Sequence, residues 1–406
     1  MNKEEMKSYI HQTIEASHAE LKEISDYIYN NPELGYEEYK SAAVQVEYLK
    51  KIGYEVTEKA AGIDTAFLGR YQNGEGIHVA IFSEYDALPI GHACGHNLIA
   101  TAAMGAALGI KSAMEKYDIK GVVTIVGGPA EEGGGGKIKL LDAGCYDDMD
   151  CAMAVHPTSA VSRVAGGCNT SCVYTAEYHG KPAHAGNRPW DGVNALDAAM
   201  LFFNAMSYMR QMTRDGVRIR ANIPQGATNP VGSIVAFSQV QCSITAPSYN
   251  ILMETCKKIE GCFEAGAVGT GCTYTLTKKV GYKNRIPNGT LGELFRANAE
   301  ALDEPMMEGM PADNGGEDMG NVSHLIPAIN PHMTIYPKEK ISGHTELFKE
   351  IVATEAGDKF FMLNAKIMAD TTLDLLMDPE AVKAAKEELL SRLKAEYGDG
   401  YEKFMR

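Results

Sequence analysis

The order of apolar runs and helical patterns between residues 77 and 155 is the feature that most constrains the fold. Three apolar runs predict buried strands, and a helical pattern follows each of the first two: 77–82, 98–114, 122–126, 137–141 and 152–155. Strands that alternate with helices pair in parallel, because each helix carries the chain back to the edge where the next strand starts. The sequence therefore predicts an α/β domain whose mainly parallel sheet is flanked by helices.

A different pattern begins near residue 172. A half-exposed strand at 171–178 is followed by a helix, two strands, a helix and a last strand, which is the order of a small α+β domain. The α/β pattern then returns and ends in a charged helix at 379–397. We expect an inserted domain at 172–287, between two parts of the α/β domain at 1–171 and 288–406.

The charge balance limits the partners of the chain. It has 38 Lys and Arg against 53 Asp and Glu, a net charge of −15, which disfavours nucleic acid and anionic membranes. No apolar run is long enough for a membrane span, and the N-terminus lacks the apolar core of an export signal. The nine cysteines are odd in number, as expected for reduced thiols. These features predict a cytoplasmic protein that acts on a small molecule.

The segment SEYDALPIGHACGHN, at 83–97, follows the first predicted strand and carries five candidate functional side chains: Glu84, Asp86, His92, Cys94 and His96. Open α/β sheets place their sites at such strand ends. Cysteine thiolate and histidine imidazole are good ligands for a borderline metal such as zinc. The alternative is a buried thiol beside histidines that only cap the next helix.

The segment GGPAEEGGGG, at 127–136, places two adjacent glutamates after the second strand. Neighbouring side chains of an extended segment point in opposite directions, so one of Glu131 and Glu132 can bind a metal while the other reaches an attacking water. The glycines allow a substrate to approach the backbone closely, and their spacing is not that of a phosphate-binding loop. The alternative is a flexible loop with a solvated acidic pair.

Two further histidines lie after apolar segments, His156 in AVHP and His344 in SGHTE. Taken singly, each is as easily explained by a structural role. Together with Cys94, His96 and one of the two glutamates they provide five ligands at plausible strand ends. A set of this size suits two metal ions that share one bridging group.

Six segments resemble the dinuclear-metal exopeptidase and amidohydrolase family, which includes aminoacylase, carboxypeptidase G and auxin-conjugate amidohydrolase. They are EYDALPIGHACGHN, PAEEGGGGK, AVHP, YHGKPAHAGNRPWDGVNALDAA, DMGNVSHLIPAI and GHTELF. The match covers nearly the whole chain. It is most similar to the branch with β-alanyl-lysine dipeptidase and aminobenzoyl-glutamate hydrolase, in which a cysteine stands in the first metal motif.

The resemblance implies a role for each residue of the site. The implied metal ligands are Cys94 as the bridge, His96 and His156 at one ion, and Glu132 and His344 at the other. Glu131 would be the general base and acid, and Asp86 would orient a ligand. His92 is interpreted as a neighbour outside the metal shell. The metal would be zinc or manganese, with cobalt also possible.

The inserted segment resembles the lid and dimerisation domain of the family, which implies a homodimer. His184 of GKPAHAG matches a histidine that stabilises the oxyanion in the active site of the other protomer. The lid position at which relatives often carry an arginine is Thr245 here, which puts recognition of a free α-carboxylate in doubt. Arg285 is a candidate for binding a substrate carboxylate, with an exposed surface charge as the alternative.

These observations predict a metal-dependent hydrolase that cleaves an amide bond of a dipeptide or an N-acyl amino acid. In the expected reaction, Glu131 takes a proton from a metal-activated water and later passes it to the leaving amine. Two alternatives stay open. Cys94 could act as a nucleophile with His92 or His96 as its base, or the chain could be a non-catalytic relative that binds a ligand.

Overall fold

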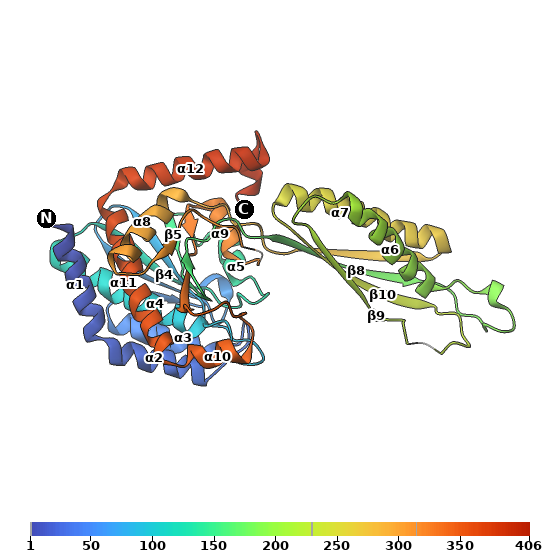
Figure 1. The fold of residues 1–406 in the computed structure, drawn as a ribbon, viewed down its shortest axis with the longest axis horizontal. Helices are drawn as coiled ribbons and strands as arrows, with labels where there is room; N and C mark the ends of the chain where they lie inside the picture. Colours follow the sequence, from blue (N-terminus) through green and yellow to red (C-terminus); the bar gives the residue numbers. More distant parts are fainter. Residues whose placement is uncertain (1, 229, 314) are drawn as a thin grey trace. The chain divides into compact units, whose positions relative to one another are not determined.

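The computed structural model describes residues 2–228, 230–313 and 315–406, which form two compact units. The first unit comprises Met1–Gly167, Arg285–Asp313 and Glu317–Arg406, and the second comprises Cys168–Asn284 with Asn314–Gly316. The chain thus leaves the first unit after residue 167 and returns to it at residue 285. The boundaries expected from the sequence are at 172 and 288. Figure 1 colours the chain along its length and labels many of the elements named below.

The first unit is built on a six-stranded sheet with the order β1-β2-β4-β3-β5-β13. The strands are β1 (Glu55–Glu58), β2 (Phe67–Asn73), β3 (His78–Ser83), β4 (Gly121–Gly127), β5 (Cys151–Met153) and β13 (Ala328–Ile329). β3 pairs in parallel with both β4 and β5, and β13 pairs in parallel with β5, whereas β1 and β2 are antiparallel. β3 and β4 are buried along their whole length, which explains their continuous apolar sequences.

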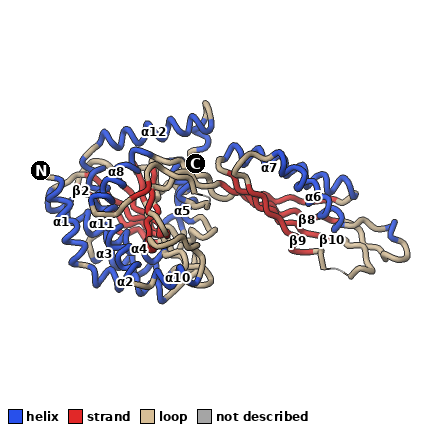
Figure 2. Tube along the Cα trace, viewed as in Figure 1, coloured by secondary structure: helices blue, strands red, loops and turns tan. Residues whose placement is uncertain are grey.

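Helices cover both faces of this sheet, as Figure 2 shows by colour. The longer helices are α1 (Lys3–Ala16), α2 (His18–Asn30), α3 (Tyr39–Lys51), α4 (His96–Tyr117), α8 (Gly289–Ala301), α11 (Glu355–Met377) and α12 (Pro379–Tyr397). The shorter ones are α5 (Gly136–Asp142), α9 (Met319–Leu325) and α10 (Glu346–Val352). Successive residues of a strand point to opposite faces of the sheet. Ile81 packs in the cluster of α4 and α11, while Phe82 packs in the cluster of α5 and α9.

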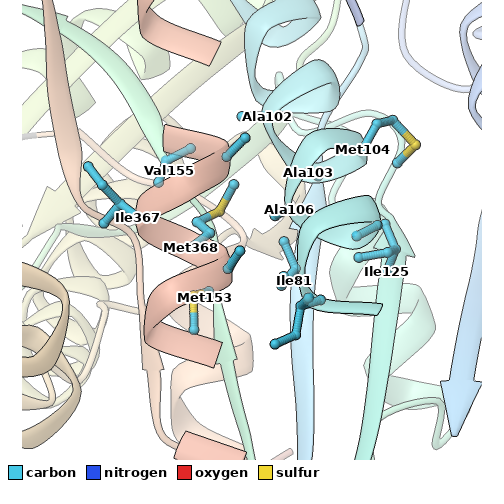
Figure 3. Close-up of a cluster of buried hydrophobic side chains, with 14 of the residues drawn as sticks. Ile81, Ala102, Ala103, Met104, Ala106, Ile125, Met153, Val155, Ile367 and Met368 are labelled. Carbon is cyan, nitrogen blue, oxygen red and sulfur yellow. The ribbon is translucent and has the colours of Figure 1, made fainter. Parts of the chain in front are cut away.

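The core between α4, α11 and the sheet combines alanine and methionine side chains with branched aliphatic ones such as Ile81 and Ile367 (Figure 3). Ala102 and Ala106 of α4 and Met368 of α11 belong to it. A Cβ atom on Gly105 would lie 2.7 Å from the Cβ of Ala365, so the two helix backbones approach closely at this glycine. This packing fixes α4, whose first residue, His96, belongs to the site described below.

A second, four-stranded sheet of the first unit has the order β12-β7-β14-β6. Its strands are β12 (Met306–Met307), β7 (Ser162–Arg163), β14 (His332–Tyr336) and β6 (His156–Ser159). β14 runs parallel to β6 and antiparallel to β7. Since β6 begins three residues after β5 ends, the small sheet continues from the carboxyl edge of the large one.

The second unit is an antiparallel sheet of order β11-β8-β10-β9 with two helices. Its elements are β8 (Thr170–His179), α6 (Ala195–Met209), β9 (Arg218–Gln225), β10 (Phe237–Ala246), α7 (Tyr249–Thr270) and β11 (Thr273–Val280). The buried residues of β8 and β10 alternate along each strand and pack with α6 and α7 in one core. This order, strand, helix, strand, strand, helix, strand, is the one expected from the sequence.

Three smaller observations complete the fold. The first helical pattern, read as continuous up to Asn31, is divided at Ser17, where ψ is 8° and the side chain bonds back to the carbonyl of Thr13. Short 3₁₀ turns lie at Ala60–Gly62, Pro189–Asp191, Arg210–Met212 and Tyr401–Phe404. Among the helices that the structure describes, none combines the length and the apolar character that crossing a membrane requires.

Candidate metal centre

The candidate site lies at the carboxyl edge of three neighbouring parallel strands. The loop after β3 carries Cys94 and leads into α4 at His96, and the loop after β4 carries Glu131 and Glu132. β5 is followed by His156 at the start of β6. Because the carboxyl ends of parallel strands meet at one edge, the fold brings these side chains together from separate parts of the sequence.

Cys94 occupies the middle of the cluster. Its Sγ atom lies 3.4 Å from Nε2 of His156 and 3.5 Å from Nε2 of His344. Nε2 of His344 lies in turn 3.2 Å from Oε1 of Glu132. His344 is in the left-handed backbone region, at φ 61°, and its N–H donates to the carbonyl of Ala93 at 3.0 Å. That backbone bond ties a residue far along the chain to the loop of Cys94.

The ligand atoms form overlapping groups in which all atoms lie within 4.8 Å of one another. One group is Cys94, His96 and His156, another is Cys94, Glu132 and His344, and a third is His96, Glu131 and Glu132. Thiolate, imidazole and carboxylate are the ligands that zinc and similar ions accept. Since Cys94 belongs to two groups, the arrangement fits two ions with the thiolate between them.

Asp86 fixes the orientation of His96. Nδ1 of His96 lies 2.9 Å from the carbonyl of Asp86 and 3.0 Å from its Oδ1 atom, so Nδ1 donates and Nε2 keeps its lone pair. The other carboxylate oxygen of Asp86 accepts from the backbone N–H of Glu132 at 2.9 Å. One carboxylate thus positions two of the candidate ligands.

Two of the ligand atoms, Nε2 of His96 and Oε1 of Glu132, are buried with no hydrogen-bond partner among the described residues. Oε1 of Glu132 lies 3.2 Å from Nε2 of His344, which is itself a candidate ligand atom. Leaving a buried polar atom without a partner is unfavourable. A cation would satisfy both atoms, which supports the fit of the residues to metal ions.

The cluster also concentrates negative charge. Burial raises the pKa of Cys94, but the neighbouring His156 and His344 outweigh it and bring that pKa to about 6. Burial lowers the pKa of His156, but the Cys94 thiolate outweighs it and raises that pKa to about 9. Contacts with Cys94 and Glu132 raise the pKa of His344 to about 10. A bound divalent cation would take the place of these protons.

Glu131 lies beside a buried network of charges. Lys137 is completely buried, and its Nζ atom lies 2.8 Å from Oε1 of Glu84 and 2.5 Å from Oδ1 of Asp318. Burial and the carboxylates of Glu84 and Asp318 raise the pKa of Glu131 well above its ordinary value. Lys137 is not predicted as a site residue from the sequence, although a lysine directly after a glycine run at the start of a helix could have indicated one.

His92 lies apart from the ligand groups, as interpreted from the sequence. Its Nε2 atom is 3.1 Å from the carbonyl of Ile28, and its ring stacks on Tyr29 with centroids 6.3 Å apart. Burial lowers the pKa of His92 to about 4, so it stays neutral. This histidine joins the loop of Cys94 to α2.

Two residues of interest lie in the second unit. His184 is exposed, and its Nδ1 atom accepts from the backbone N–H of Gly186 at 3.1 Å, which leaves Nε2 as the donor of the neutral ring. Thr245 lies on β10, and its hydroxyl oxygen accepts from Nη2 of Arg220, on the neighbouring β9, at 3.4 Å. An arginine therefore stands next to the lid position even though that position itself is threonine.

Arg285 is buried, with 1% of its surface exposed, so the alternative of an exposed surface charge is wrong. Its Nε atom donates to the carbonyl of Gly166 at 2.6 Å, and its Nη atoms bond Glu317 and, at 3.4 Å, Asp313. A direct contact with substrate stays a prediction.

Comparison with known proteins agrees with this geometry. Residues 80–363 match the model of peptidase family M20/M25/M40. The chain is 36% identical to mouse Xaa-Arg dipeptidase over 82% of the chain and 80% of that protein. It is 29% identical to one of the two chains of the p-aminobenzoyl-glutamate hydrolase of Escherichia coli, over 58% of this chain and 53% of that one. A solved dinuclear metal-binding M20 peptidase from Bacillus subtilis shares the fold, with a TM-score of 0.68, 16% identity, and coverage of 89% of this chain and 99% of that one.

Proposed function

We propose that this chain, which belongs to peptidase family M20/M25/M40 and is a hydrolase of carbon–nitrogen bonds, uses two metal ions to cleave the amide bond of a dipeptide or an N-acyl amino acid. The observation that carries the proposal is the position of Cys94, which is shared between two groups of ligand atoms. A purely structural cluster has no need of five ligand-type side chains with two of their atoms left without partners.

The substrate class follows from the relatives. The mouse relative is an Xaa-Arg dipeptidase, and the similarity to it extends over four-fifths of both chains. Dipeptides with a basic C-terminal residue are therefore the first substrates to test. Aminobenzoyl-glutamate and N-acyl amino acids come next, because the similarity to the Escherichia coli hydrolase covers a smaller part of the chain.

The residues that would hold the ions are Cys94 between them, His96 and His156 on one side, and Glu132 and His344 on the other. Zinc or manganese suits these ligands best, and cobalt is also acceptable. When bound, such ions polarise an amide carbonyl and lower the pKa of a water molecule towards neutrality.

The side chains of the protein carry the proton transfers. Glu131, buried beside the ligands, would accept the proton of the attacking water and deliver it to the leaving amine. Asp86 would keep Nε2 of His96 available as a ligand atom. His184, whose neutral ring carries its proton on Nε2, is the proposed donor to the developing oxyanion.

A cytoplasmic location and a homodimeric assembly are parts of the same proposal. The location is supported by the nine cysteines, none of which forms a disulfide among the described residues. The assembly rests on the likeness of the second unit to the family's dimerisation domain. Sedimentation of the purified protein tests it, since a mass of one chain in solution would contradict the homodimer.

The decisive experiment measures metal content and hydrolysis on the same gently purified protein. We expect about two divalent ions per chain, cleavage of at least one basic dipeptide or N-acyl amino acid, and loss of cleavage on chelation that one metal reverses. Activity that survives chelation but is lost on alkylation would instead identify Cys94 as a nucleophile. Metal-loaded protein that cleaves no substrate of a broad panel would indicate a binding protein.

The Glu131→Gln variant separates chemistry from metal binding. We expect its kcat to fall by at least about 100-fold, because a general base contributes that much or more. Its metal content should equal that of the wild type, because the assigned ligand atoms are unchanged. A variant that keeps most of its kcat would remove Glu131 from the mechanism.

A further inference from the structure

One face of the small sheet is polar and begins at a candidate metal ligand. On β6 and β14 the burial alternates, so that Pro157 and Met333 point to the core while their neighbours are only half-buried. His332 pairs in register with His156, and Thr334 pairs with Thr158. Residues in register on adjacent strands point to the same face of a sheet. The half-buried face therefore runs from His156 across to β14.

Arg163, on β7, continues the row of paired residues that begins with His156 and His332. It pairs with His332 across β7 and β14, and its Nη2 atom lies 2.9 Å from Nδ1 of His332. An Oδ2 atom of Asp313 lies 3.5 Å from the same nitrogen and is too distant to compete for it. Since arginine only donates, Nδ1 of His332 must accept, and the proton of the neutral ring lies on Nε2. The structure thus fixes the tautomer of this histidine.

The Nε2–H group of His332 is a buried donor with no hydrogen-bond partner among the described residues. Its ring lies against that of His156, with centroids 5.2 Å apart, so the donor is adjacent to the metal centre. Unpaired buried donors are rare in proteins because they are unfavourable, and each one needs an explanation. A ligand that brings an acceptor atom to this position is such an explanation.

The donor is also held rigidly. Asp313 accepts from Nη2 of Arg163 at 2.9 Å and from Nη2 of Arg285 at 3.4 Å, and its backbone N–H bonds the carbonyl of Gly167 at 2.8 Å. Arg285 is in turn bonded to Glu317. The positive and negative charges of these four side chains compensate one another. The net effect of the network is therefore to hold Arg163 against His332.

We propose that His332 donates a hydrogen bond from Nε2 to an oxygen atom of the substrate, an inference that rests on the amide hydrolysis proposed above. The bond from Arg163 to Nδ1 withdraws charge from the ring and strengthens Nε2–H as a donor to a negative oxygen. Two substrate oxygens have this chemistry: the carbonyl oxygen of the scissile amide as it becomes negative, and a carboxylate of the substrate. His332 is thereby a substrate-binding residue contributed by the first unit.

Three substitutions separate the possible roles of the ring. His332→Asn keeps an acceptor for Arg163 and loses the distal donor, whereas His332→Gln places an amide N–H near the position of Nε2. His332→Phe keeps the ring against His156 and loses both nitrogens. His11→Phe is the matched control, because His11 is also a half-buried histidine that contacts a carboxylate, on α1.

The assay is steady-state hydrolysis of the best dipeptide and of its C-terminal amide, with metal content and melting temperature measured for every variant. We expect His332→Asn and His332→Phe to lower kcat/KM at least about tenfold with metal content unchanged, and His332→Gln to recover a large part of the loss. A lower kcat on both substrates identifies the scissile carbonyl as the acceptor. A higher KM on the dipeptide alone identifies its carboxylate.

Binding gives a second measurement that does not depend on turnover. Calorimetry with the dipeptide on metal-loaded Glu131→Gln protein, with and without His332→Asn, should show weaker binding in the double variant if the carboxylate is the acceptor. Wild-type kinetics in both His332→Asn and His332→Phe would overturn the inference. It would also be overturned if His332→Phe were active and His332→Gln inactive. A wild-type protein without amidase activity would instead refute the proposed function. If His332→Phe does not fold, the Asn and Gln pair decides.

Discussion

The buried ammonium of Lys137 allows a quantitative test of how the site is held together. It lies between Glu84 and Asp318, at 2.8 Å and 2.5 Å, and its backbone N–H also donates to Asp318 at 3.1 Å. Burial lowers the pKa of Lys137, but the carboxylates of Asp318 and Glu84 outweigh it and raise that pKa well above its ordinary value. The lysine is therefore charged in the folded protein at any pH of interest.

Replacing Lys137 by methionine keeps most of the volume and removes the charge. Two buried carboxylates then face each other without a cation, and breaking a buried ion pair in this way costs about 3–5 kcal/mol. This is a large part of the total stability of a folded protein, about 5–15 kcal/mol. The double variant Lys137→Met, Asp318→Asn should recover part of the loss, because it removes one of the two unpaired charges.

The assay is urea unfolding followed by far-UV circular dichroism, with the midpoint concentration compared between variants. Lys139→Met is the control on the same helix, since Lys139 is exposed and its contact is with the ring of Tyr36, a cation–π interaction expected to contribute at most about 1 kcal/mol. A Lys137→Met protein with the midpoint of the Lys139→Met control would refute the view that this cation holds the two carboxylates in place.

Two further outcomes follow from the contacts of single side chains. Asp86→Asn should weaken metal binding about 10- to 100-fold, because it removes the carboxylate that orients His96. Competition with a chelator measures the affinity of the variant for the metal. An affinity equal to that of the wild type would show that His96 needs no such partner. Burial lowers the pKa of His78, which bonds Thr124 through Nε2 at 2.7 Å, so the unfolded chain binds a proton more readily than the folded one. The stability owed to neutral His78 is therefore present above the ordinary histidine pKa of about 6.5 and is lost as the pH falls below it. The free energy of unfolding of the wild type should decline more steeply below a pH of about 6.5 than that of His78→Gln, and parallel pH profiles would contradict this.

The elements that the sequence predicts best are those with long, regular patterns. β3 and β4 are continuous apolar runs because both faces of the sheet are covered, and α4 is rich in alanine because it packs closely on α11. β1 is a short and mostly exposed edge strand, and its polar sequence carries little signal. β7 and β12 have two residues each and form only because distant segments pair with them.

The residues of the candidate site also differ in how well the sequence predicts them. Cys94 and His96 stand in one short segment and Glu131 and Glu132 in another, so these side chains are visible together in the sequence. The small sheet was not expected from the sequence, and so neither was the proximity of His332 to His156, which depends on the register between β14 and β6.

Several of the groups that hold the candidate ligands in place come from distant parts of the chain, and charge balance explains their presence. A site that gathers Cys94, Glu131 and Glu132 at one edge of a sheet needs cations and donors behind it, and a buried charge is tolerated only when it is paired. The segment at 127–136 that carries Glu131 and Glu132 is rich in glycine, so few of its side chains can serve as such partners. Lys137 meets Asp318 from 181 residues away, and Arg163 meets His332 from 169 residues away. Local motifs can therefore identify the chemistry of this site, whereas the long-range pairs that hold it in position appear only in the folded chain.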